Sequence, residues 1–116
     1  MSRKPAKKKQ DEMILQEIER LSNLFATLDD DKRQLAESLI ERVAFMTITL
    51  QILENNIKTK GPTYLFKQGS QQMYVENPAQ KSYNTMINRY TAAYNALFNL
   101  LPKNDGEYVD DEFENF

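Results

Sequence analysis

Residues 31–59, DKRQLAESLIERVAFMTITLQILENNIKT, decide the fold. Their apolar side chains recur every three or four residues, the spacing that gathers them on one face of an α-helix. The regular seam consists of Ala36, Leu39, Val43, Met46, Leu50, Leu53 and Ile57. A second stripe, Ile40, Ala44, Ile48 and Ile52, makes the apolar face broader than a two-helix contact needs. The sequence therefore predicts one long central helix, which serves either an intrachain bundle or a subunit interface.

Another helix is predicted before it, over residues 11–27. Its apolar positions again step by three and four residues, and Asp11 and Glu12 lie where a helix start favours negative charge. The acidic triplet 29–31 then separates the two helices. Because no second carboxylate cluster lies nearby in the sequence, we interpret the triplet as an N-cap and first helical turn and not as a metal site.

The central helix is predicted to stop at Gly61-Pro62, a common way to end a helix. Apolar and polar residues alternate over 63–76 around a turn that contains Gly69, which predicts a hairpin or an extended connector that packs on a helix or on a neighbour. Asn77-Pro78 then matches an N-cap followed by proline at the first helical position. A third helix is expected over 78–101, ending before Pro102.

These elements predict an all-α protein with three main helices. We expect a helical domain over residues 11–102, preceded by a basic disordered arm (1–10) and followed by an acidic disordered tail (103–116). Residues 1–12 carry a net charge of +3, residues 13–102 are neutral, and residues 103–116 carry −5. Terminal blocks of like charge repel themselves and often serve as interaction tails.

The residue types argue against catalysis. The chain has neither cysteine nor histidine, which removes disulfides, thiolate and imidazole metal ligands, and the commonest general base. Its three glycines are too scattered for a phosphate-binding loop. We therefore expect a protein that is not an enzyme and that uses no cofactor and no metal. No apolar run approaches the length of a membrane span, which predicts a cytosolic protein without membrane contact.

The two arms suggest different partners. In the basic arm, Arg3, Lys4, Lys7, Lys8 and Lys9 could neutralise DNA phosphates, and the alternative is a tail that only confers solubility. In the acidic tail, Tyr108, Phe113 and Phe116 alternate with carboxylates, a pattern consistent with a segment that orders on a partner protein. This tail could instead be inert, or could shield the chain's own basic arm.

Several motifs in combination resemble the small terminase subunits of tailed phages. They are Gly61-Pro62 after a long helix, Glu76-Asn77-Pro78-Ala79, the polar and aromatic helix from Tyr83 to Tyr94, and Leu100-Leu101-Pro102. The resemblance covers about residues 13–102. It implies a non-catalytic component of a DNA-packaging motor in the host cytoplasm, which binds double-stranded viral DNA, forms a homo-oligomeric ring and delivers the DNA to the large ATPase/nuclease subunit.

With this resemblance, the acidic tail looks like a docking segment for the large terminase subunit or the portal. The residues expected at the interface between ring subunits are Leu39, Val43, Met46, Leu50, Leu53, Tyr90 and Tyr94. No helix-turn-helix is evident, so no base-reading residue is assigned. The alternative function is a structural helical assembly or scaffold protein without a nucleic-acid role, and a transcriptional regulator is a third possibility.

Overall fold

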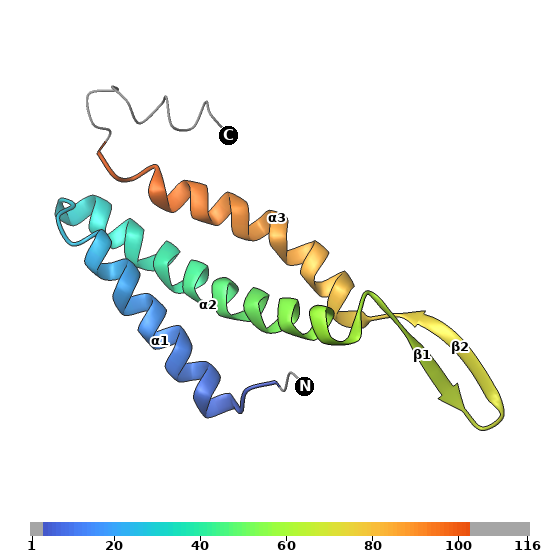
Figure 1. Ribbon diagram of the computed structural model, residues 1–116. Helices are drawn as coiled ribbons and strands as arrows, with labels where there is room; N and C mark the ends of the chain where they lie inside the picture. The colour runs from blue at the N-terminus through green and yellow to red at the C-terminus, as the bar shows by residue number, and fades with distance from the viewer. Residues whose placement is uncertain (1–3, 103–116) are drawn as a thin grey trace.

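A computed structural model describes residues 4–102, which form three helices and one hairpin (Figure 1). In chain order these are α1 (Lys7–Leu24), α2 (Asp30–Lys60), β1 (Thr63–Gln68), β2 (Gln71–Glu76) and α3 (Pro78–Phe98). The predicted mainly helical fold with a long central helix and a connector before the last helix is confirmed. Residues 1–3 and 103–116, on which much of the predicted terminal disorder falls, lie outside the described residues.

Both ends of α2 are set by the residues that the sequence indicated. The Asp29 carboxylate accepts a hydrogen bond from the backbone N–H of Lys32 at 3.0 Å, and Asp30 and Asp31 occupy the first turn, where they complement the helix dipole. At the other end the helix stops at Gly61, whose φ of +83° is a conformation that side chains with a Cβ rarely adopt. Local capping chemistry therefore fixes a helix of 31 residues.

The predicted start of α1 is wrong by four residues, because the helix begins at Lys7 and contains no acidic residue in its first turn. The backbone N–H of Gln10 donates to the Ala6 carbonyl oxygen at 2.9 Å, which continues the helical ladder back to Ala6. Lysine is itself a good helix former, so residues 7–10 extend the helix and are not an irregular arm. Asp11 and Glu12 consequently lie one turn inside the helix.

The ends of α1 and α3 also differ slightly from the prediction. Helix α1 stops at Leu24 and α3 at Phe98, each three residues early. After α3, the N–H groups of Leu100 and Leu101 bond carbonyl oxygens three residues back, at 3.1 and 3.2 Å. This tighter turn replaces the last predicted helical turn, as is common at helix ends.

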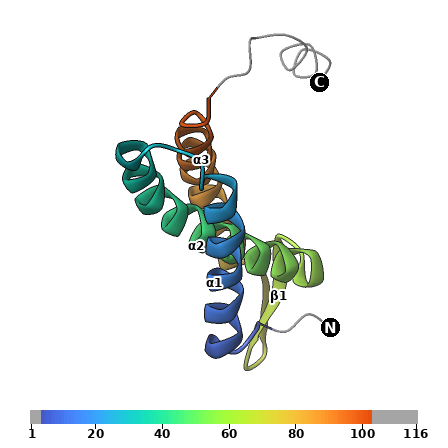
Figure 2. The ribbon, with the colours of Figure 1, turned by 90° about the vertical axis from the view of Figure 1, so that its left-hand side faces the viewer.

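The core lies at the end of α2 where the chain turns from α1. It is formed by Leu21, Phe25 and Leu28 from the first helix and the following loop, Ala36, Ile40, Val43 and Ala44 from α2, and Leu97 from α3. The rings of Phe25 and Phe98 meet edge to face, with centroids 5.2 Å apart. At this end α1 and α3 pack on α2 together, and α1 crosses α2 at an angle in Figure 2.

The hairpin extends beyond the helices at the opposite end of α2 (Figure 1). Its strands are antiparallel, with Phe66 opposite Met73 and Leu65 opposite Tyr74, and Gly69, at φ +61°, opens the two-residue turn. Only Tyr64 and Val75, next to the helices, are partly buried. Of the two predicted possibilities, packing on a helix or on a neighbour, the single chain therefore provides helix packing only at the base of the hairpin.

A buried asparagine joins the base of the hairpin to both neighbouring helices. Asn77 is only 3% exposed, and its side chain donates to the carbonyl oxygen of Gly61 at 2.9 Å and to Oδ1 of Asn56 at 2.8 Å. Its own Oδ1 accepts from the backbone N–H of Ala79 at 3.0 Å, the predicted N-cap bond of α3. We call this junction of Gly61, Pro62 and Asn77 the hairpin neck.

Candidate nucleic-acid interface

Four of the five cations predicted to bind DNA are described by the structure. Lys4 lies in the segment before α1, whereas Lys7, Lys8 and Lys9 form the first turn of the helix, and all four are exposed. Arg3 lies outside the described residues. Successive residues of an α-helix point about 100° apart, so the three helical lysines spread around the start of α1 and do not lie on one face. We call these four lysines the basic start of α1.

The helix end adds positive charge to that of the lysines. The first N–H groups of a helix carry a partial positive charge, which acids in the first turn usually balance. Here that turn has no acid, and Ala6 at the N-cap position provides no side-chain acceptor. Because the lysine charges and the helix dipole have the same sign, a bound anion is favoured by both.

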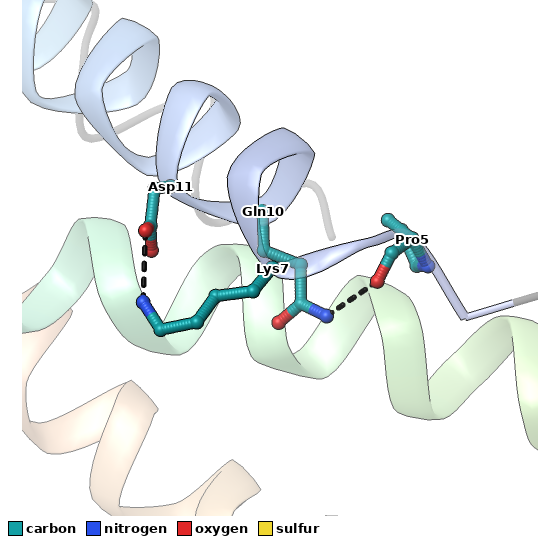
Figure 3. Close-up of polar contacts among 4 residues, drawn as sticks. All are labelled: Pro5, Lys7, Gln10 and Asp11. Carbon is teal, nitrogen blue, oxygen red and sulfur yellow. Dashed lines mark hydrogen bonds and ion pairs between the residues drawn. The ribbon is translucent and has the colours of Figure 1, made fainter.

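Among the described residues, one carboxylate forms an ion pair with these lysines. The Lys7 ammonium contacts Oδ2 of Asp11 at 2.8 Å, as Figure 3 shows, but the side chains are 86% and 55% exposed, so the pair contributes little to stability. The Gln10 side chain donates to the Pro5 carbonyl oxygen at 2.7 Å and holds the preceding segment against the helix (Figure 3). Within residues 4–102 no ion pair uses Lys4, Lys8 or Lys9, so their charges are open to a ligand.

The basic start of α1 lies beside the half of α2 that carries the hairpin. Lys4, Pro5 and Gln10 line a cleft of about 410 Å³ together with Asn55 and Asn56 of α2. The hairpin neck follows α2 directly, at Gly61. The lysines and the hairpin therefore share one end of the molecule, and the core and the exit of the chain at Pro102 lie toward the other.

The structure separates the predicted interface residues into buried and open ones. Val43 and Leu50 are 1% and 4% exposed and lie inside the single chain, so their prediction as subunit contacts is corrected to intrachain packing. Leu39 and Tyr90 are partly buried against the same core. Met46 and Leu53 line open grooves, and Tyr94 is 38% exposed while it stacks on Phe98. The physical reason is that α1 and α3 cover most of the central seam from within the chain.

Sequence reasoning missed two exposed features. The first is the set of large apolar side chains on the hairpin, Leu65, Phe66, Met73 and Tyr74, which are 38–77% exposed. The alternation of these residues was visible, but no pattern says that a strand lacks a partner. The second is a groove between α2 and α3, where Arg42 of one helix meets Lys81 and Arg89 of the other. The spacing of Lys81 and Arg89 places them on one helix face, and only the fold adds Arg42.

Other predicted features remain outside what the structure addresses. Tyr108, Phe113 and Phe116, predicted to bind a partner, lie outside the described residues. Between residues 4 and 102, no three acidic side chains are grouped so that they could hold a metal ion. None of the described helices is long and apolar enough to cross a membrane.

Comparison with protein-family models, curated proteins and solved structures finds no match for this chain.

Proposed function

We propose that this chain is a non-catalytic, DNA-binding adaptor of phage DNA packaging, of the kind found in small terminase subunits. In this proposal it binds double-stranded viral DNA in the host cytoplasm, assembles into a homo-oligomeric ring and presents the DNA to the large terminase subunit. The observation that carries the proposal is the basic start of α1, where four exposed lysines and an uncapped helix N-terminus attract the same ligand, an anion. Spaced phosphates along a duplex satisfy several such cations at once.

The hairpin supports the assembly part of the proposal. A two-stranded hairpin is at best marginally stable in water by itself, and this one exposes apolar side chains on both faces and two unpaired edges. Contact with further copies of the chain covers these surfaces. A ring also multiplies the charge of the basic start, because every subunit adds its own lysines.

For the acidic tail, we propose that Tyr108, Phe113 and Phe116 bind the large terminase subunit or the portal. Alternating aromatic and acidic residues suit a segment that orders on a basic surface. Co-purification of the full chain with the products of neighbouring genes tests this directly. Recovery of a large ATPase subunit is the expected result, and its loss from a chain without residues 103–116 would assign the contact to the tail.

DNA binding is tested by a matched pair of double variants. Lys8→Gln/Lys9→Gln removes two charges from the basic start, and Lys32→Gln/Arg33→Gln removes two exposed charges from the first turn of α2. Each lost phosphate contact should reduce the slope of log affinity against log salt concentration by about 0.9. We therefore expect the slope to fall by about 2 in the first variant and to stay unchanged in the second. Equal effects of the two variants would mean that only net charge matters.

The exposed hairpin also favours a second candidate, a structural assembly protein without a nucleic-acid role. The two functions differ in one measurement, duplex DNA binding by the assembled full chain at low salt. An oligomer that does not bind DNA under these conditions is a scaffold protein. DNA binding with a steep salt slope would support the packaging adaptor over the scaffold protein.

A further inference from the structure

The groove between α2 and α3 combines a cationic rim with an apolar floor. Its volume is about 530 Å³, and Arg42, Lys81 and Arg89 line it together with Phe45, Met46 and Met86. Among the described residues that line this α2–α3 groove there is no carboxylate. The described ion pairs of the chain, Lys7–Asp11, Glu17–Arg20 and Asp30–Arg33, use none of its three cations.

The floor of the groove is an unusual place for a large aromatic side chain. Phe45 lies in the middle of α2 and is 52% exposed, although its neighbours Val43 and Ala44 are fully buried. Phe45 also lines the cleft beside the basic start of α1, so apolar surface continues from one depression into the other. An occupant that suits this surface has aromatic groups for the floor and acidic groups for the rim.

We propose that the occupant is the chain's own C-terminal segment, residues 103–116. This segment has six carboxylates against one lysine, and it holds three aromatic side chains, Tyr108, Phe113 and Phe116. Its composition therefore complements the groove in both respects, charge and apolar surface. The inference is independent of DNA binding, since none of the lysines of the basic start of α1 lines the α2–α3 groove.

The segment is long enough to reach the groove. Arg89 and Lys81 precede the end of α3 at Phe98 by nine and seventeen residues, which corresponds to about 14 and 26 Å along the helix axis. The eleven residues from 103 to 113 span up to about 36 Å when extended. After the turn that ends at Pro102, the segment can therefore run back along α3 and place Phe113 or Phe116 over Phe45.

A tethered occupant also has a kinetic and thermodynamic advantage. A short flexible connection gives an effective concentration of the order of mM, which exceeds that of any free partner in dilute solution. The individual ion pairs at the rim are exposed and weak, so the aromatic contacts have to anchor the segment and the charges orient it. A protein partner of the tail must then displace it from the groove.

Disulfide cross-linking between the groove and the C-terminal segment tests the proposal. Because the chain has no cysteine, the introduced thiols are the only ones that can react. In the full chain, Thr85→Cys places a thiol in the groove and Asn115→Cys places one in the tail. The control pairs Asn115→Cys with Asn84→Cys, an exposed position next in sequence but turned away from the groove lining. Both double variants are oxidised mildly, and the rate of disulfide formation and the mass of the product are measured.

We expect the Thr85 pair to close at least about tenfold faster than the Asn84 pair, as a monomer and at a rate independent of protein concentration. Adding Arg42→Glu and Arg89→Glu to the Thr85 pair should lower its rate to that of the control, while the helical circular dichroism stays unchanged. Equal rates for the two pairs would overturn the proposal and leave the groove for another partner. A disulfide-linked dimer as the main product would overturn it too, because the tail would then come from a second copy.

Discussion

The side-chain amide of Asn77 donates a hydrogen bond to the backbone carbonyl oxygen of Gly61 at 2.9 Å, across the base of the hairpin. Sixteen residues separate the two in the sequence. The bond satisfies a carbonyl at the end of α2 with the residue that caps α3, so one side chain ends one helix and starts the next. This one buried amide therefore ties the end of α2 to the start of α3 at the base of the hairpin.

Replacement of Asn77 by alanine should destabilise the fold by about 2 kcal/mol, since it removes an N-cap and leaves buried polar groups without partners. Urea unfolding measured by circular dichroism gives the free energy. Asn84→Ala is the matched control, because Asn84 is exposed and accepts only one surface hydrogen bond, from Gln80. Equal losses in the two variants would contradict the role assigned to the hairpin neck.

Removal of the Asp11 carboxylate, which pairs with the basic start of α1, should strengthen DNA binding. Asp11→Asn frees the Lys7 ammonium, which lies 2.8 Å from Oδ2 of Asp11, and deletes a negative charge that repels phosphate. We expect tighter binding at low salt and a steeper salt slope, both opposite in sign to the effects of Lys8→Gln/Lys9→Gln. As a control, Asp31→Asn makes the same charge change at the first turn of α2. Unchanged binding in Asp11→Asn would show that Lys7 does not contact DNA.

Charges on one of the two exposed apolar faces of the hairpin should disrupt assembly. Phe66 and Met73 lie opposite each other on the two strands and are 41% and 54% exposed. The double variant Phe66→Lys/Met73→Glu replaces these two apolar side chains by one cation and one anion, so the net charge of the chain does not change. The control is Gln68→Lys/Gln71→Glu. It introduces the same two charges at the next cross-strand pair on this face, beside the turn. Light scattering should report a smaller mass for the first variant only. An unchanged mass would exclude this face from the subunit interface.

Tyr83 should ionise at higher pH than a free tyrosine. Its hydroxyl donates to Oε2 of Glu54 at 3.1 Å, and this hydrogen bond, helped by desolvation and the Glu54 charge, raises the pKa of Tyr83 above 10.0. Because the pKa is raised on folding, the bond stabilises the protein below about pH 10 and its contribution is lost as pH rises through the folded pKa.

Ultraviolet titration of tyrosinate tests this, with Tyr83→Phe identifying the relevant step. Glu54→Gln should return the pKa of Tyr83 toward its ordinary value, whereas Glu41→Gln, an exposed change on the same helix, should leave the curve unchanged. Identical titration curves in the Glu54 variant and the parent chain would mean that the two side chains do not interact in solution.

The parts of the fold that were predicted correctly are those that depend on neighbours in sequence. Asp29 and Asn77 cap helices because their short side chains reach N–H groups two or three residues ahead, and Gly61 ends α2 because it tolerates positive φ. Such chemistry is complete within a few residues. The start of α1 was missed because two features competed, the acids at 11 and 12 and the helix-forming lysines before them, and the sequence does not say which prevails.

The candidate surfaces depended instead on which helices meet. A seven-residue seam on α2 looks uniform in the sequence, yet Val43 is buried, Met46 lines a groove and Phe45 beside them is half exposed. The crossing of α1 and α3 over α2 decides these differences. For the same reason the rim formed by Arg42 and Arg89 has no local signature, since each cation comes from a different helix.

The antiparallel arrangement of α1 on α2 gives the molecule a direction. The lysines and the hairpin lie toward one end of α2, whereas the chain leaves the described fold at Pro102, beyond the core end. In a closed cyclic assembly every subunit repeats the same direction relative to the axis. Where α2 runs along that axis, all basic starts would lie at one mouth of the ring, and every chain would leave the described fold at Pro102 toward the other. The two sides of such a particle differ, so under the proposed function the duplex would meet one side and the C-terminal segment of every subunit would start from the other.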